Sequence, residues 1–128
     1  MSKEATKSAK VLVVDDDPAI AKSLCVRLMS AGYQVDTAHD GVSATQRAIG
    51  GKPNLIILDL SMPAGDGFTV LERLGENPDT MGIPVVVLTA SKKPELRERV
   101  RKAGAVAFFE KPFEAWDLMQ VIEREIGG

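Results

Sequence analysis

The stretch Leu55-Ile56-Ile57-Leu58-Asp59-Leu60-Ser61-Met62-Pro63 decides the fold that we expect for this chain of 128 residues. Its first four residues are aliphatic, without a polar break, and they end at the carboxylate of Asp59. Such a run predicts a strand that is buried on both faces, as in a parallel sheet. In an open parallel sheet, ligands bind beyond the carboxyl ends of the strands. Asp59 is therefore a candidate site residue, although an Asp that only opens the following turn is the alternative.

The composition of the chain indicates one globular domain. Hydrophobic residues make up 45% and charged residues 27% of the sequence, which is ordinary for a soluble protein. The net charge of −2 gives no overall attraction to nucleic acid or to an anionic membrane. We expect residues 10–128 to form the domain, after a flexible polar tail at residues 1–9.

The chain has one cysteine, Cys25, so no disulfide can form within it. Cys25 lies in an apolar helical pattern, which predicts a buried structural thiol rather than a reactive one. No apolar run is long enough to span a membrane, and the N-terminus lacks the apolar segment of a signal peptide. We therefore expect a cytoplasmic protein that does not bind membranes.

Apolar runs and helical patterns alternate along the whole chain. Asp17 before Pro18 is typical of a helix N-terminus, and Gly32 and Gly104 are typical of residues that end a helix. Strict alternation of strand and helix indicates an α/β fold with a parallel sheet and right-handed connections. The predicted strands are 11–14, 34–38, 55–59, 85–88 and 106–109, and the predicted helices are 18–31, 41–49, 68–74, 94–103 and 113–126.

The spacing of apolar residues in the predicted helices selects the side chains that should face the core. The fourth helix has a thin apolar stripe between Lys, Arg and Glu residues, so we expect it to be weakly anchored. The selected residues are Ile20, Leu24, Leu28 and Met29 in the first helix, Leu96 and Val100 in the fourth, and Leu118, Val121, Ile122 and Ile126 in the last, with Trp116 and Met119 at its margin.

Polar side chains stand at the carboxyl ends of four predicted strands. They are Asp15 and Asp16, then Asp59, Thr89 and Lys111. These strand ends share one edge of the sheet, where three carboxylates repel each other unless a cation keeps them ionised. Oxygen ligands without a Cys or His cluster favour a hard ion, Mg²⁺, with Mn²⁺ as an alternative. An ammonium and a hydroxyl suit an anion, so the set predicts a phosphoryl site; a solvated acidic edge is the alternative.

Four pieces of this sequence, in this order and at this spacing, resemble the CheY-like receiver domain of response regulators in two-component signalling. The resemblance extends from Lys10 to Ile126, and it implies a doubly wound, flavodoxin-like five-stranded sheet in the order 2-1-3-4-5. The pieces are Val13-Val14-Asp15-Asp16-Asp17-Pro18, Leu58-Asp59-Leu60-Ser61-Met62-Pro63 with Asp66-Gly67, Leu88-Thr89-Ala90, and Lys111-Pro112-Phe113.

The resemblance implies a role for each strand-end residue. Asp59 is expected to be the phosphoacceptor, with Thr89 and Lys111 holding the phosphoryl oxygens. The expected Mg²⁺ ligands are the side chains of Asp16 and Asp59, the backbone carbonyl of Ser61, and Asp15, directly or through water.

The resemblance also implies a switch. Phe108 takes the place of the family's switch aromatic, which is often Tyr. Because Phe108 has no hydroxyl, we expect a plain ring rotation, with Thr89 as the sensor of the phosphoryl group. A cis peptide bond is expected between Lys111 and Pro112.

The identity of Ser61 distinguishes a receiver domain from a phosphatase. Haloacid-dehalogenase-like phosphatases carry a second Asp two residues after the nucleophile, where this chain has Ser61, so such a hydrolase is the disfavoured alternative. Ser61 and Ser91 stand where the family places residues beside the attacking water, and they leave the lifetime of the acyl phosphate open. A nucleotide-binding domain is disfavoured too, because acids stand where a glycine-rich loop would follow the first strand.

The expected function is a phosphorylatable switch without enzymatic activity beyond its own phosphorylation and dephosphorylation. Its partners would be a sensor histidine kinase or a His phosphotransfer protein, and a downstream protein bound at residues 94–103, 106–109 and 113–126. His39 is expected to be a surface loop residue rather than a phosphodonor. The charged run 92–102 contains Glu95 and Glu98, so we expect no nucleic-acid binding. The chain ends just past the last helix, so no output domain is expected.

Overall fold

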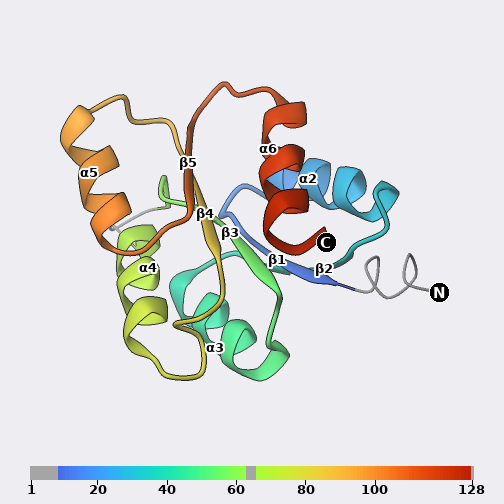
Figure 1. The fold of residues 1–128 in the computed structure, drawn as a ribbon, viewed down its shortest axis with the longest axis horizontal. Coiled ribbons are helices and arrows are strands. Elements are labelled where there is room, and N and C mark those ends of the chain that lie inside the picture. Colours follow the sequence, from blue (N-terminus) through green and yellow to red (C-terminus); the bar gives the residue numbers. More distant parts are fainter. Residues whose placement is uncertain (1–8, 63–65, 128) are drawn as a thin grey trace.

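The computed structural model describes residues 9–62 and 66–127, and within these ranges the chain forms a five-stranded parallel sheet with helices on both faces (Figure 1). The strand order is β2-β1-β3-β4-β5, which confirms the predicted doubly wound α/β fold. The strands are β1 (Lys10–Val14), β2 (Gln34–Ala38), β3 (Leu55–Asp59), β4 (Val85–Thr89) and β5 (Ala107–Glu110). The helices are α2 (Pro18–Ser30), α3 (Gly41–Gly51), α4 (Asp66–Glu76), α5 (Pro94–Lys102) and α6 (Ala115–Ile122), and a π-helical turn, Glu123–Gly127, follows α6.

The boundaries of the elements differ from the prediction mainly at helix ends. Helix α3 continues through Gly51 rather than ending before Gly50, and α6 begins at Ala115 rather than at Phe113. Gly32 and Gly104 do follow helices, with φ of 98° and 100°, a left-handed conformation that favours glycine. The predicted tail up to residue 8 and residues 63–65 of the predicted turn lie outside the described residues.

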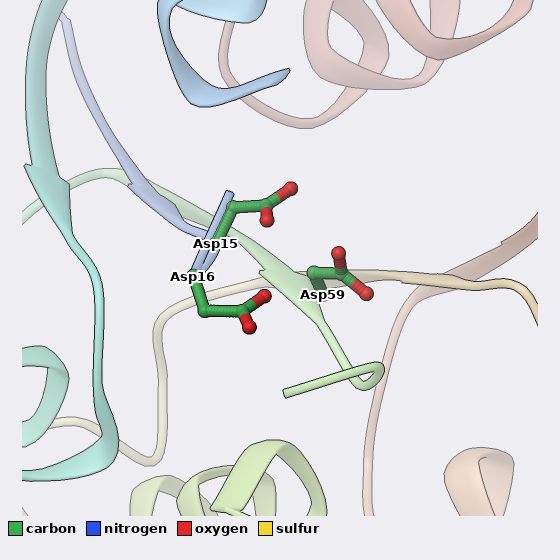
Figure 2. Close-up of side chains that lie close together, drawn as sticks. All are labelled: Asp15, Asp16 and Asp59. Atoms are coloured by element: carbon green, nitrogen blue, oxygen red, sulfur yellow. The ribbon is translucent and has the colours of Figure 1, made fainter. Parts of the chain in front are cut away.

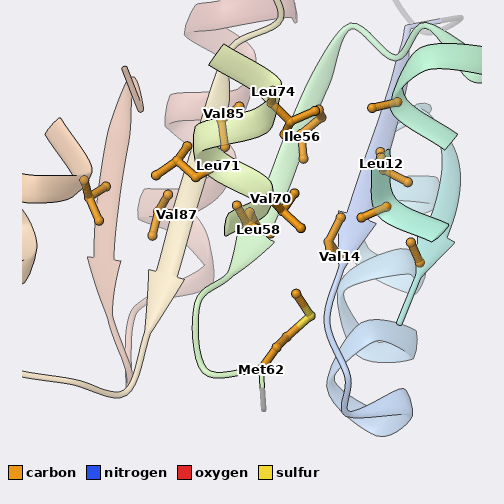
Figure 3. Packing of buried hydrophobic residues seen from close by; sticks show 14 residues of the cluster. Leu12, Val14, Ile56, Leu58, Met62, Val70, Leu71, Leu74, Val85 and Val87 are labelled. Atoms are coloured by element: carbon orange, nitrogen blue, oxygen red, sulfur yellow. The ribbon is translucent and has the colours of Figure 1, made fainter. Parts of the chain in front are cut away.

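The middle of the sheet is buried on both faces. Every residue of β3 and β4 is buried, as their unbroken apolar runs predict. One apolar cluster packs this sheet against α3, α4 and α5, and Figure 3 shows Ile56, Leu58 and Val87 beside the α4 residues Leu71 and Leu74. A second cluster packs the other face against α2 and α6. The five strands thus hold their carboxyl ends along one rigid edge.

Two predicted core contacts are wrong, and Trp116, which was expected at the margin of the core, lies in solvent. Ile20 and Met29 are 37% and 63% exposed, because α2 instead turns a narrow face with Ala21, Leu24 and Leu28 toward the sheet. Trp116 is 68% exposed. It lies two residues before the buried Leu118, and residues two apart do not share a helix face.

Cys25 is half-buried beside the second cluster, so the predicted buried thiol is correct only in part. Burial raises the pKa of this thiol above its ordinary value, which disfavours the reactive thiolate. None of the helices in the described ranges combines the length and the apolar character needed to cross a membrane.

Candidate functional site

Three carboxylates meet at the carboxyl edge of the sheet. Asp15 and Asp16 follow β1, and Asp59 is the last residue of the neighbouring strand β3 (Figure 2). One carboxylate oxygen of each residue lies within 4.8 Å of those of the other two. Asp15 and Asp59 are buried, whereas Asp16 is exposed. The topology therefore brings together the three acids that the sequence placed at strand ends.

Asp59 is held in place through both of its carboxylate oxygens. The backbone amide of Ser61 donates a hydrogen bond to Oδ1 at 2.8 Å. The ammonium of Lys111 donates to Oδ2 at 2.7 Å, and the Lys111 side chain is itself only 23% exposed. A buried carboxylate needs this kind of compensation to remain ionised. Both oxygens of the buried Asp59 carboxylate are thus satisfied by hydrogen-bond donors at the carboxyl edge of the sheet.

Asp15 is the least compensated of the three acids. Its Oδ1 accepts a hydrogen bond from the amide of Asp17 at 2.8 Å, but its buried Oδ2 has no partner among the described residues. Burial raises the pKa of the Asp15 carboxyl from 3.8 to about 6, against the opposing effect of the Asp17 amide. The negative charge of Asp59 adds to the increase.

This arrangement fits a divalent cation. An unpartnered oxygen beside two further carboxylates is satisfied when a cation binds, and the cluster offers oxygen ligands alone. Such a ligand set favours Mg²⁺ over the softer metals that Cys or His would select. Ser61 contacts Asp59 through its backbone amide. The proposal that the Ser61 carbonyl binds the metal therefore stays a prediction.

Thr89 and Lys111 lie next to each other at the same edge. The backbone amide of Lys111 donates to the carbonyl of Thr89 at 2.8 Å. Thr89 is buried, and its Oγ1 accepts a hydrogen bond from the amide of Ser91 at 3.0 Å. Since that bond uses the oxygen as acceptor, the hydroxyl hydrogen of Thr89 remains available to donate. Both predicted phosphoryl-binding groups therefore keep donor capacity, since the Lys111 ammonium also donates to Asp59.

Three contacts near the acidic cluster were not predicted from the sequence. Ser61 Oγ accepts a hydrogen bond from the amide of Ala90 at 3.2 Å, which joins the loops that follow β3 and β4. A side chain at Gly67 would lie 2.6 Å from Cα of Leu60, so the start of α4 packs directly on the end of β3. His39 is exposed, as expected, but its Nδ1 lies 2.8 Å from the carbonyl oxygen of Asp15. Motif spacing does not reveal such contacts, because each joins backbone to a residue of ordinary type.

Phe108 is half-buried on β5, away from the acids, and it packs against the first core cluster. The guanidinium of Arg97 in α5 lies 4.9 Å from the centroid of the Phe108 ring, another contact that the sequence did not reveal. The peptide bond between Lys111 and Pro112 is cis, as predicted.

The fold and the acidic pocket define a CheY-like class of protein, and comparison with known proteins agrees. A family model for the response regulator receiver domain matches residues 11–123. The chain therefore belongs to the response regulator receiver domain family of two-component systems.

Solved structures and curated proteins show the same likeness. The chemotaxis protein CheY4 of Vibrio cholerae is 32% identical with a TM-score of 0.84, over 92% of this chain and 98% of that one. The receiver domain of sensor histidine kinase PA1611 from Pseudomonas aeruginosa PAO1, described with a magnesium ion in its active site cleft, is 27% identical with a TM-score of 0.83, over 94% of this chain and 99% of that one. The DNA-binding dual master transcriptional regulator RpaA of a Synechocystis strain is 38% identical over 86% of this chain and 46% of its own length. This chain spans between 24% and 58% of the length of such curated relatives.

Proposed function

We propose that this chain is a phosphorylatable switch that accepts a phosphoryl group on Asp59 from a sensor histidine kinase or a His phosphotransfer protein. One observation carries this proposal. The Asp59 carboxylate is 2% exposed, fixed by an amide and the Lys111 ammonium, and surrounded by two further acids. In this setting Asp59 would act as a nucleophile rather than as a structural ion pair, because Lys111 and the Thr89 hydroxyl offer donors to an added phosphoryl group and the neighbouring acids could hold a cation beside it.

The transfer follows from the position of these groups. A carboxylate oxygen of Asp59 forms a bond to phosphorus, while the bond from phosphorus to the donor histidine nitrogen breaks and its electron pair remains on the imidazole. The acyl phosphate adds negative charge beside Lys111, whose ammonium is already within hydrogen-bonding distance of Asp59. The Thr89 hydroxyl supplies a second donor.

Asp15, Asp16 and Asp59 would hold Mg²⁺ through their side chains, with Ser61 contributing its carbonyl and Mn²⁺ as an alternative ion. When bound, the metal neutralises the charge that builds up on the transferring phosphoryl group. The buried Oδ2 of Asp15 supports this assignment, since it has no hydrogen-bond partner among the described residues.

The signal would leave through α5, β5 and α6, where a downstream protein would bind in the cytoplasm. Residues 10–128 would form the domain that does this. The disfavoured alternative is a phosphatase with an aspartyl-phosphate intermediate, which needs a general acid at the position of Ser61. The Ser61 hydroxyl instead accepts a hydrogen bond from the amide of Ala90.

Intact-mass measurement after incubation with a small phosphodonor and Mg²⁺ tests the proposal. We expect one phosphoryl group per chain, no uptake by Asp59→Asn, and normal uptake by the control Asp36→Asn. Asp36 is a matched carboxylate because it lies on β2 and pairs with Arg47 at 2.8 Å. Undiminished uptake by Asp59→Asn would sink the proposal, and so would continuous release of phosphate from substrates.

A further inference from the structure

Glu110, the last residue of β5, links three parts of the molecule around the pocket. Its Oε1 lies 3.3 Å from Nη2 of Arg97 in α5, and its Oε2 lies 3.9 Å from Nζ of Lys92 in the loop before α5. The same Lys92 ammonium donates to the carbonyl of Lys111 at 3.4 Å. One carboxylate therefore ties both the β4–α5 loop and α5 to the strand that leads into Lys111.

The position of Glu110 places this link between the two groups proposed to hold phosphoryl oxygens. Glu110 is the register partner of Thr89 in the sheet, and it directly precedes Lys111. The amide of Lys111 also donates a hydrogen bond to the carbonyl of Thr89. A displacement of Thr89 or of its loop thus changes the distance between Lys92 and Glu110.

Arg97 connects the link to Phe108. Phe108 and Glu110 are two residues apart on one strand, so their side chains leave the same face of the sheet. The Arg97 guanidinium contacts both, with Nη2 3.3 Å from Glu110 Oε1 and Cζ 4.9 Å from the Phe108 ring centroid. The Phe108 ring is thus in contact with a cation of α5, so a rotation of the ring changes this contact.

Helix α5 buries few of its side chains. Among its residues, all of which the structure describes, Val100 is the one that is fully buried. Lys93 occupies the N-cap position without a side-chain hydrogen bond to any described amide. The contacts of Lys92 and Arg97 with Glu110 therefore add to a small set of other attachments, which includes the packing of Leu96 on the first cluster and the Arg99 guanidinium 4.1 Å from the Phe68 ring centroid.

We propose that Glu110 is a positioning residue, which with Lys92 and Arg97 forms an ionic latch that holds α5 and Phe108 in the unphosphorylated arrangement. This inference rests on the proposed function: a phosphoryl group on Asp59 that accepts from the Thr89 hydroxyl would draw Thr89 and its loop toward it. That movement opens the latch, so the latch opposes the phosphorylated arrangement. Weakening it makes that arrangement more accessible without altering any group that touches the phosphoryl oxygens.

The test compares Glu110→Gln with Glu98→Gln. Both variants remove one carboxylate, but Glu98 pairs with Arg101 inside α5 and does not reach β5. Titration with the phosphoryl analogue beryllofluoride and Mg²⁺ should give about two- to fivefold tighter binding for Glu110→Gln, and no change for Glu98→Gln. The difference between the two variants should shrink as salt rises, because the paired charges are exposed.

A second readout does not depend on phosphoryl chemistry. In the unmodified protein, amide hydrogen exchange in residues 94–102 should be about two- to fivefold faster in Glu110→Gln than in Glu98→Gln. Equal exchange and equal analogue affinity in the two variants would overturn the latch. If wild type fails to bind the analogue at all, the proposed function fails, and the exchange comparison still decides whether Glu110 holds α5.

Discussion

Helices α2 and α5 both begin at a proline one short loop beyond the pocket, yet they are anchored very differently. Asp17 caps α2 by accepting hydrogen bonds from the amides of Ala19 and Ile20 at 2.9 and 3.4 Å, and Ala21, Leu24 and Leu28 bury its inner face. Within the described residues, Lys93 gives α5 no such cap, and Val100 is its one fully buried side chain. The same pocket thus faces one firmly held helix and one loosely held helix.

This difference indicates which helix would respond structurally to phosphorylation of Asp59. Asp15 Oδ1 accepts a hydrogen bond from the amide of Asp17, the N-cap residue of α2. The start of α2 is therefore attached directly to the acidic cluster. The loop before α5 carries the groups that would respond to a phosphoryl group, and α5 moves at little free-energy cost because it buries little apolar area. We therefore expect α5 to carry the response and α2 to remain in place.

The largest expected effect is on the firmly held helix. Leu28→Ala should lower the free energy of unfolding by about 2 to 5 kcal/mol, since Leu28 is 1% exposed and its removal leaves a cavity. Val26→Ala is the control on the same helix, because Val26 is 58% exposed and should change stability by about 0.5 kcal/mol or less. Denaturant titration measures both. A loss for Leu28→Ala as small as that for Val26→Ala would remove the contrast between α2 and α5.

The next effect concerns Asp15, which joins α2 to the pocket. Its pKa is raised from 3.8 to about 6 in the folded protein, so ionisation opposes folding. This destabilisation is absent below about pH 3.8, grows as pH rises through that window, and is complete above about pH 6. Asp15→Asn keeps an acceptor for the Asp17 amide and should raise the free energy of unfolding by about 1 to 3 kcal/mol at pH 7 without metal.

Two further measurements sharpen this prediction. The advantage of Asp15→Asn should vanish near pH 4, and millimolar Mg²⁺ should stabilise wild type more than the variant. Thermal melts with metal and with chelator check this. An advantage that is constant from pH 4 to pH 7 would contradict the assigned cause.

The smallest effect compares the two helix starts directly. Asp17→Ala should destabilise the protein by about 1 kcal/mol, because two amides of α2 lose their acceptor. Lys93→Ala at the equivalent position of α5 should change stability by about 0.5 kcal/mol or less. Equal losses in denaturant titration would mean that the two helices are anchored alike.

Much of the sheet was predictable from the sequence, and the reason is visible in β3. A run such as Leu55 to Leu58 has few alternatives to a doubly buried strand, and parallel topology then collects the strand ends without any further information. The pocket acids and Lys111 were predictable on the same ground. Their exact roles as ligands remain predictions, because they depend on a metal and a phosphoryl group.

Side-chain contacts at the surface were not predictable in this way. The apolar spacing of the last helix predicts Trp116 at the margin of the core, but the helical phase set by Leu118 places it in solvent. The contacts among Arg97, Glu110 and Phe108 depend on how α5 packs on β5. The charged sequence of α5 predicts only a solvated helix face. Such contacts join residues that are distant in sequence and common in type.

Amide hydrogen exchange with and without beryllofluoride on Asp59 tests the central claim most directly. We predict changed exchange in residues 94–102 and near Phe108, with residues 18–30 of α2 unchanged apart from their first turn. Asp59→Asn treated in the same way is the control and should show no change. Changes confined to the surroundings of Asp15, Asp59 and Lys111, with none in α5, would contradict the account.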